Sequence, residues 1–456
     1  MYKDRTFFII ALLCFMAFSC SKDKPAVIIT PEPTDEYSQY GTPFGEVPAT
    51  EDVIMYEVNL RAFSPTGDLA GVVNRLDNLK NLGVNVIWLM PIHPIGQVNS
   101  VNSPYSVKDY KAISSEYGTL SDLRMLTDEA HARGMAVIMD WVANHTAWDN
   151  SWISNKSWYT QNTSGEIVIP AGTNWQDVAD LNFENSSMRE AMIDVMKYWV
   201  LEANIDGYRC DYADGVPFDF WKTAIDSLKS IPNRDYVLLA EGGRLDHWEA
   251  GFDLIYAWDF YGALKSVYEG QPAFRIFNVH QIEYGGIPSG KHKLRYSTNH
   301  DESAWDQTPM ILFNGKEGAT AASVVTIFMG GVPMIYTGQE VGRTSNVPFF
   351  SNSAINWNDN PDMLNAYEEL LNFYNGSSVS KTGSITNYSN TDIVCFKKKL
   401  NEEELLVIVN MREEQLDFPI PTNLQNTSWT DALTGEVIAI SNNLSLSGYE
   451  YYVLKK

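Results

Sequence analysis

Eight short apolar runs alternate with longer segments of helical periodicity over most of this chain. Each run has the length of a buried strand, and each intervening segment can hold a helix. The runs are VIMYEVNL (53–60), VNVIWLM (84–90), AVIMDWV (136–142), DGYRCD (206–211), YVLLAE (236–241), DLIYAWDF (253–260), LRYSTNH (294–300) and VPMIYTG (332–338). This alternation predicts an α/β fold, a (β/α)8 TIM barrel.

The helical segments between the runs support this prediction. In SSMREAMIDVMKYWVLEANI (186–205), Met188, Met192 and Trp199 belong to one apolar face with a helical period. An open, doubly wound sheet is the alternative arrangement. It would carry a glycine-rich loop after its first strand, and VIMYEVNLRAFS (53–64) contains no glycine. We therefore expect the closed barrel.

Two regions depart from the alternation and mark further units. Residues 146–180 are rich in Trp, Asn and Ser and lack helical periodicity, which predicts a short inserted subdomain after strand three. After residue 376, short strands follow one another with polar turns, which predicts a C-terminal antiparallel β-domain over 376–456. The barrel then occupies 51–375.

The N-terminus has the order of an export signal. Lys3 and Arg5 precede the apolar run FFIIALLCFMAF, which is too short to span a bilayer and ends at Ser19 and Cys20. We expect 1–20 to be a lipoprotein signal with Cys20 acylated; a plain signal peptide and an uncleaved anchor are the alternatives. Residues 21–50 predict a flexible linker. The protein would then be secreted across the inner membrane and lipid-anchored in a bacterial envelope, on its periplasmic or outer side.

The net charge indicates which partners the chain avoids, and the cysteine spacing indicates free thiols. A formal net charge of −24 disfavours nucleic acid and anionic membrane surfaces, so the membrane contact would be the lipid anchor alone, and a neutral substrate fits best. Of the four cysteines, Cys210 and Cys395 lie in apolar runs, without a CxxC signature. They predict buried free thiols. Nothing in the sequence predicts an organic cofactor.

Polar side chains gather where the predicted strands end, which is where barrel enzymes hold their active sites. The strand ends DWVANH, GYRCD, LLAEGG and STNHDE and the loop SPYSVKDY supply Asn144, His145, Arg209, Asp211, Glu241, His300, Asp301 and Tyr105. Burying several acids together without partners costs several kcal/mol, so a structural role alone does not account for them.

Arg209 and Asp211 are two residues apart on one strand, so they share a face. A neighbouring arginine lowers the pKa of a carboxyl group, which predicts an ionised Asp211. Glu241 follows one βα unit later without a neighbouring cation, and we expect it to keep its proton longer. An acid beside an ionised carboxylate is the arrangement of a retaining glycosidase, with carboxyl groups ~5–5.5 Å apart.

These segments resemble glycoside hydrolase family 13, the α-amylase family, over about residues 52–456. The resemblance includes DWVANH, DGYRCD, LLAEGG and STNHDE in the expected order, with VADLNFEN (178–185) and GVPMIYTGQE (331–340). It implies Asp211 as nucleophile, Glu241 as acid/base and Asp301 as third carboxylate. It also implies a set of sugar-binding residues, namely Tyr105, His145, Arg209 and His300. The implied substrates are α-glucans and maltooligosaccharides.

The sequence also departs from the family pattern. Many relatives carry a Lys-His pair shortly after the nucleophile, and here Asp211 is followed by YADG. This puts in doubt a contact to the leaving-group sugar and a calcium ligand. Asn144 and Asp180 match positions that often bind calcium in the family. The alternative is that both only hydrogen-bond their loop, so calcium stays an open expectation.

Three other readings compete with an α-amylase-like hydrolase. A magnesium-dependent lyase would use Asp211, Glu241 and Asp259 on successive strands, but would leave Arg209 without a role. A starch-binding surface lipoprotein would need no intact catalytic set. Within the family, a cyclomaltodextrinase, a neopullulanase or an α-glucosidase is the nearest alternative.

Overall fold

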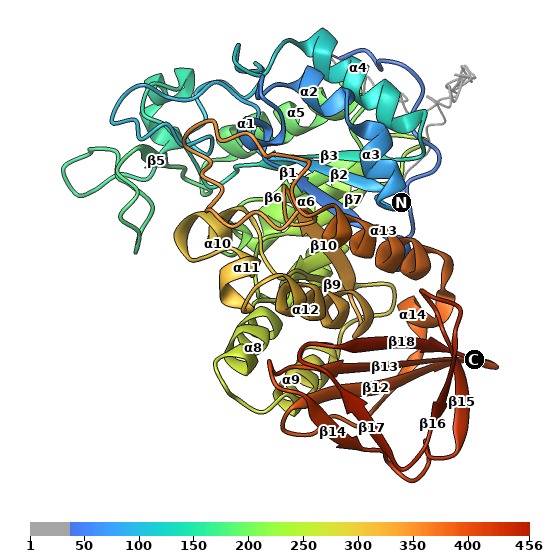
Figure 1. Cartoon of the computed structure of the whole chain (residues 1–456). Helices are drawn as coiled ribbons and strands as arrows, with labels where there is room; N and C mark the ends of the chain where they lie inside the picture. The colour runs from blue at the N-terminus through green and yellow to red at the C-terminus, as the bar shows by residue number, and fades with distance from the viewer. Residues whose placement is uncertain (1–36) are drawn as a thin grey trace, which may run out of the picture. The chain divides into compact units, whose positions relative to one another are not determined.

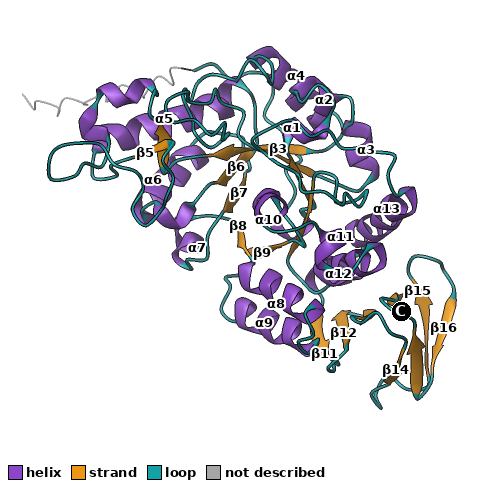
Figure 2. Ribbon diagram, turned by 60° about the vertical axis from the view of Figure 1, so that its left-hand side comes forward, coloured by secondary structure: helices purple, strands orange, loops and turns teal. Residues whose placement is uncertain are grey.

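The computed structural model describes residues 37–456, and its centre is a closed barrel of parallel strands (Figures 1 and 2). The strands are β1 (Met55–Val58), β2 (Val86–Leu89), β3 (Ala136–Trp141), β6 (Gly207–Cys210), β7 (Val237–Ala240), β8 (Leu254–Tyr256), β9 (His292–Arg295) and β10 (Val332–Tyr336). They follow one another around the barrel in chain order, and β10 closes it by pairing with β1. The predicted barrel is confirmed, with all of its predicted strands.

Helices surround the barrel (Figure 2). The longer ones are α4 (Leu120–His131), α5 (Ser186–Glu202), α6 (Phe218–Lys229), α8 (Trp258–Tyr268), α9 (Phe274–Tyr284), α12 (Lys316–Phe328) and α13 (Pro361–Gly376). The shorter ones are α1 (Leu60–Phe63), α2 (Leu69–Val73), α3 (Leu76–Asn81), α7 (Asp246–Ala250), α10 (His300–Trp305), α11 (Pro309–Leu312) and α14 (Ser378–Thr382). Between residues 37 and 456, no helix combines the length and the apolarity that crossing a membrane requires.

Strand side chains alternate between the barrel interior and the layer beneath the helices. Trp88, Tyr256 and Leu294 belong to the interior cluster. Ile87 and Leu238 belong to the outer cluster, together with the apolar face of α5. Side chains therefore fill the interior, and a ligand must bind at the ends of the strands.

The segment after β3 forms the predicted insertion. β4 (His145–Ala147) and β5 (Val178–Asp180) pair in antiparallel fashion and close its base. Between them lie two 3-10 turns, η2 (Ser151–Ser154) and η3 (Lys156–Trp158). The Trp152 ring packs 5.0 Å from that of Tyr110, measured between centroids, so part of the insertion is anchored on the barrel.

The chain ends in antiparallel strands, as predicted. A sheet runs in the order β11 (Ser384–Asn387), β12 (Ile393–Leu400), β13 (Glu403–Asn410), β18 (Tyr451–Lys455), β15 (Thr427–Asp431) and β16 (Val437–Ile440). β14 (Leu416–Pro419) pairs with β17 (Asn443–Leu446). Cys395 lies in the core of this domain; like Cys210 in the barrel, it is a buried free thiol, as expected.

Two sequence predictions need correction. The run 253–260 is not all strand, because β8 ends at Tyr256 and α8 begins at Trp258. Asp259 therefore lies in the first turn of a helix, which removes the strand position that the lyase reading needs.

The predicted linker 21–50 also extends too far. Residues 37–50 pack on the barrel: Phe44 stacks on His131 at 4.4 Å, and the backbone N–H of Tyr40 donates to the Leu201 carbonyl at 2.8 Å. The aromatic rings in this stretch give it apolar surface to bury. The predicted signal, Cys20 and residues 21–36 lie outside the described residues.

Candidate active site

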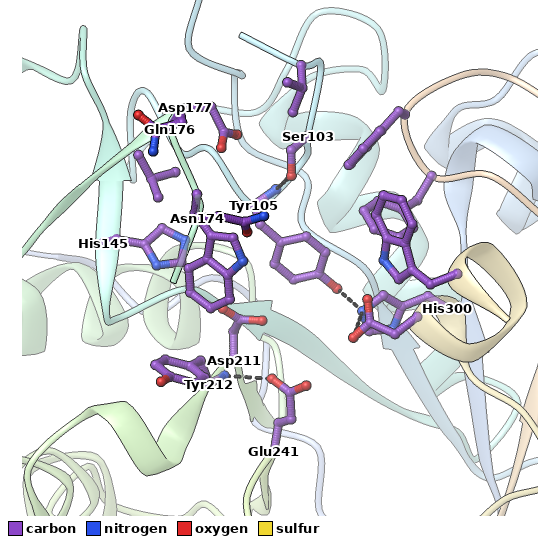
Figure 3. A pocket seen from close by; sticks show the side chains of 17 residues that line it. Ser103, Tyr105, His145, Asn174, Gln176, Asp177, Asp211, Tyr212, Glu241 and His300 are labelled. Atoms are coloured by element: carbon purple, nitrogen blue, oxygen red, sulfur yellow. Dashed lines mark hydrogen bonds and ion pairs between the residues drawn. The ribbon is translucent and has the colours of Figure 1, made fainter. Parts of the chain in front are cut away.

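A cavity of about 630 Å³ lies at the carboxyl ends of the barrel strands (Figure 3). The predicted residues that line it are Tyr105, His145, Asp211, Glu241, His300 and Asp301. Arg209 contacts two of these carboxylates from below. Asn144 and Asp180 are not among the lining residues. The fold thus brings together residues that are almost 200 positions apart in the sequence.

Arg209 is fully buried and contacts three carboxylates. Its Nη1 donates to Asp140 Oδ1 and to Asp211 Oδ1, each at 2.9 Å. Its Nη2 lies 3.0 Å from Glu241 Oε2, an ion pair that lacks the alignment of a hydrogen bond. One planar guanidinium therefore sets the spacing between Asp211 and Glu241.

Three carboxylates surround the single cation of Arg209, and the pKa values of Asp211 and Asp140 are raised as a result of burial and this crowding. Burial raises the pKa of Asp211 well above its usual range; Arg209 lowers it, but the charges of Glu241 and Asp140 raise it again. The prediction of a low pKa from Arg209 alone is therefore wrong in its net direction. Burial raises the pKa of Asp140 as well. The crowding of these carboxylates therefore works against the ionisation of Asp211 and Asp140.

Glu241 is oriented from the end of the neighbouring strand. The backbone N–H of Tyr212 donates to Glu241 Oε2 at 2.6 Å (Figure 3). The two strands approach closely at Gly207, where an added Cβ would fall 2.0 Å from the Val237 carbonyl oxygen. Only glycine fits there, at the amino-terminal ends of the two strands. At their carboxyl ends, the backbone N–H of Glu241 donates to the Cys210 carbonyl at 3.0 Å.

A second contact ties the loop after β6 to the loop after β7. Asp214 accepts hydrogen bonds from the backbone N–H groups of Gly243 (3.0 Å) and Arg244 (3.2 Å) and lies 2.7 Å from His247 Nε2. These hydrogen bonds overcome partial burial and lower the pKa of Asp214. At Gly242, an added Cβ would fall 2.4 Å from Asp214 Oδ1, so this close approach needs a glycine.

A hydrogen-bonded chain crosses the other side of the cavity. His300 Nδ1 pairs with the buried carboxylate of Glu57, and His300 Nε2 lies 2.7 Å from the hydroxyl of Tyr105. Tyr105 in turn donates to Asp140 Oδ2 at 3.1 Å. Burial opposes a charge on His300, but Asp301 and Glu57 raise its pKa to about 9. His300 is therefore protonated at neutral pH and can donate from both nitrogens.

Aromatic side chains form the walls of the cavity. On one side Trp175 lies 5.4 Å from His145, between ring centroids, and burial lowers the pKa of His145 to about 4, so this imidazole is neutral. On the other side the exposed Trp305 contacts Phe349 and Phe350 edge-on. The cavity therefore combines a charged floor with apolar walls, as sugar rings require.

The predicted calcium ligands do not make a site by themselves. The Asn144 carbonyl accepts the N–H of Leu181 at 3.2 Å, and its side-chain Nδ2 lies 3.3 Å from His145 Nδ1. Burial raises the pKa of Asp180, whose side-chain partner is Thr160. Calcium takes 6–8 oxygen ligands. Residues 37–456 contain no group of three His, Cys, Asp or Glu side chains arranged for a metal, so we derive no step through one.

Two functional residues were given no role from the sequence. Glu57 and Asp140 are fully buried and hold His300 and Arg209. The signal for Glu57 was present, because it is a lone carboxylate inside an otherwise apolar strand.

Residues 44–169 and 150–236 match the family described as "Alpha amylase, catalytic domain". An α-amylase of Haloarcula japonica is 26% identical over 412 residues, covering 85% of this chain and 59% of the relative. An oligo-1,6-glucosidase of Halalkalibacterium halodurans is 29% identical over 408 residues, covering 70% of this chain and 69% of the relative. The chain thus spans less than two thirds of the first of these relatives.

The fold has close counterparts among solved structures. An α-amylase from Lactobacillus plantarum superposes with a TM-score of 0.80 at 27% identity, covering 90% of this chain and 99% of that one. The two chains therefore share one fold over most of their lengths.

Proposed function

Because this chain belongs to the α-amylase family of glycoside hydrolases, we propose that it is a retaining hydrolase of α-glucosidic bonds, mainly α-1,4 bonds in starch, glycogen or maltooligosaccharides. The observation that carries the proposal is the single guanidinium of Arg209 between the carboxylates of Asp211 and Glu241. Two carboxylates that contact the two terminal nitrogens of one guanidinium lie close together, as the ~5–5.5 Å separation of retaining enzymes requires.

In the first step, a carboxylate oxygen of Asp211 attacks the anomeric carbon. The bond from that carbon to the glycosidic oxygen breaks, and Glu241 gives its proton to the leaving oxygen. Arg209 holds both carboxylates, so the attacking and protonating groups keep a fixed separation. The products of this step are a glycosyl ester on Asp211 and a shortened glucan with a free hydroxyl.

In the second step, Glu241 removes a proton from a water molecule, whose oxygen attacks the anomeric carbon. The ester bond breaks and Asp211 leaves as a carboxylate, so the product keeps the α configuration. Protonated His300 and neutral His145 line the cavity beside Asp301 and Tyr105. They bind the hydroxyls of the sugar ring whose glycosidic bond is broken.

A neutral glucan suits this cavity better than an acidic sugar. Asp177, Asp211, Glu241 and Asp301 line it, so an anionic substrate would meet repulsion. The aromatic walls offer flat apolar faces to the faces of glucose rings. Several such walls favour a chain of glucose units over a single small glycoside.

The experiment that tests this proposal is a product time course on maltoheptaose, soluble starch, pullulan and a cyclodextrin. We expect mixed maltooligosaccharides from starch and maltoheptaose. Faster cleavage of pullulan or cyclodextrin would move the assignment to a neopullulanase or cyclomaltodextrinase, and release of glucose alone to an α-glucosidase. If the folded protein cleaves none of them, the proposal is wrong, and either a different α-glucoside is the substrate or a starch-binding role takes its place.

We further propose that the enzyme is exported and anchored in a bacterial envelope by acylation of Cys20. Support for this comes from the sequence alone, through the basic start, the apolar run and the following cysteine. Metabolic labelling with a palmitate analogue is expected to label the full-length chain and to fail in Cys20→Ala. Equal labelling of both chains would contradict the anchor.

A further inference from the structure

Tyr212, directly after the proposed nucleophile, has an unusual backbone. Its φ of 42° and ψ of 46° lie in the left-handed region, which a bulky aromatic residue rarely adopts. Strain of this kind persists only where surrounding contacts enforce it, and it gathers at functional sites. The contacts of Tyr212 show what the conformation achieves.

The left-handed turn directs backbone donors at Glu241. The N–H of Tyr212 donates to Glu241 Oε2, and the N–H of Ala213 donates to the Glu241 carbonyl at 2.9 Å. An oxygen that accepts from an N–H cannot also carry the acidic proton toward that donor. The proton of Glu241 therefore belongs on Oε1, the oxygen free to face the substrate.

The same turn places the ring of Tyr212 in the cavity wall (Figure 3). The ring packs edge-on against Trp175, with centroids 5.1 Å apart. Its opposite side lies against Gly215, where an added Cβ would fall 2.3 Å from Tyr212 Cε1. The phenol oxygen has no hydrogen-bond partner among residues 37–456, so it is available to a ligand.

The side of the cavity follows from the chemistry of Glu241. A general acid must lie beside the oxygen that leaves, so a residue that both contacts Glu241 and lines the cavity borders the leaving-group sugar. Tyr212 touches Glu241, whereas His300 lies across the cavity from it (Figure 3). The three residues that follow Tyr212 (Ala213, Asp214 and Gly215) carry no basic side chain.

We propose that Tyr212 has two roles at the leaving-group side of the cavity, an inference that rests on the proposed glucan hydrolysis. Its backbone N–H positions Glu241, and its ring, with Trp175, is the platform that binds the first glucosyl unit beyond the scissile bond. Tyr212 is then a specificity-determining residue for leaving groups that are sugars.

A comparison of two substrates distinguishes binding of the leaving-group sugar by Tyr212 from a purely structural role. Maltoheptaose has a sugar leaving group, whereas the leaving group of α-maltosyl fluoride is fluoride, which fills no sugar-binding position. We expect Tyr212→Ala to lose roughly tenfold or more in kcat/KM on maltoheptaose and far less on the fluoride. Tyr212→Phe keeps the ring and is expected to retain most of both activities.

Tyr212→Gly controls for folding, because glycine adopts the left-handed conformation without strain and keeps the N–H to Glu241. We expect it to lose activity on maltoheptaose as Tyr212→Ala does, yet to melt at a higher temperature than that variant. Equal losses of Tyr212→Ala on both substrates, or no loss on either, would overturn the platform role. A parent enzyme inactive on both substrates would instead refute the proposed function and this inference with it.

Discussion

The barrel contains two fully buried arginines, and their surroundings differ. Arg209, on β6, lies beneath the cavity and contacts the carboxylates of Asp140, Asp211 and Glu241. Arg295, on β9, lies in the layer between barrel and helices and pairs with the single carboxylate of Glu283. The carboxylates that contact Arg209 exceed its single positive charge, whereas the one carboxylate that contacts Arg295 matches it.

The partners of Arg295 satisfy each of its nitrogens. Nη1 pairs with Glu283, Nε donates to the Gly330 carbonyl at 2.9 Å, and Nη2 lies 3.2 Å from His280 Nδ1. The guanidinium also lies 4.0 Å from the ring centroid of Phe260. Burial, and to a smaller extent the charge of Arg295, lowers the pKa of His280 to about 2. This histidine is therefore neutral, and its Nδ1 accepts the hydrogen bond from Arg295. Arg295 thus contacts one carboxylate directly, so this ion pair is balanced in charge.

The difference separates a group built for stability from a group built for chemistry. A balanced buried pair resists removal of either partner, because the other charge is then left alone. A buried cluster with unbalanced charge lowers the stability of the fold. Such a cluster is kept where a reaction uses its charged groups. Changes at the two arginines should therefore have opposite effects on activity and stability.

The largest effect on activity is expected at the two reacting carboxylates that contact Arg209. Asp211→Asn and Glu241→Gln should each lower kcat by several orders of magnitude, since each removes a reacting group. The pKa of Asp211 is raised by burial, so its ionised form costs stability at pH 7 and the amide removes that cost. We expect Asp211→Asn to melt about 2 °C higher than the parent in calorimetry.

Glu283→Gln is the matched control at the other arginine. It should leave kcat within roughly twofold and lower the melting temperature, the reverse of Asp211→Asn. Near-normal activity in Asp211→Asn, or a lower melting temperature in that variant, would contradict the contrast between the two clusters.

Replacing the arginines themselves should have the next largest effect. Arg295→Met strands the carboxylate of Glu283, and we expect it to lower the free energy of unfolding by about 3–5 kcal/mol in urea titrations. Arg209→Lys keeps a charge but loses the planar fork that spaces two carboxylates. It should lower kcat at least about a hundredfold with a smaller loss of stability. If Arg295→Lys also lowered kcat this far, the two sites would not be distinct.

A smaller effect is expected in the pH dependence. The pKa of His300 is about 9 in the fold and ~6.5 in an unfolded chain. The pairing thus contributes stability in full below pH ~6.5 and loses it as pH rises through about 9. Glu57→Gln removes a charge that raises this pKa, so the alkaline limb of kcat/KM should move down by roughly one pH unit. An unmoved limb would show that His300 does not titrate in that range.

The smallest effect is expected from metal removal. Asn144 and Asp180 bring too few oxygens for calcium, and the proposed steps use only side chains of the chain itself. Dialysis against EGTA should leave kcat unchanged and shift the melting temperature by less than about 2 °C. A large drop, reversed by added calcium, would show that backbone or water ligands complete a site there.

The sequence predicted the barrel and the cavity residues because both depend on repeating or local patterns. Strand and helix periods are local, and residues at strand ends converge in any such barrel. Arg209 and Asp211 could be paired from their spacing alone.

The charge balance and the cavity walls could not be predicted in this way. The net pKa direction of Asp211 depends on Glu241 and Asp140, which come from other strands. Trp175 and Phe349 reach the cavity from long loops whose paths no period specifies. The left-handed turn at Tyr212 was equally hidden, since an aromatic residue gives no signal for it.

The most direct test of the central claim is the configuration of the first product. Proton NMR of the reducing ends, recorded within the first minutes of maltoheptaose cleavage, distinguishes the α from the β anomer before mutarotation mixes them. The close spacing of Asp211 and Glu241 on one guanidinium predicts the α anomer, through a covalent ester on Asp211. Initial formation of the β anomer would show direct attack by water and would contradict this account.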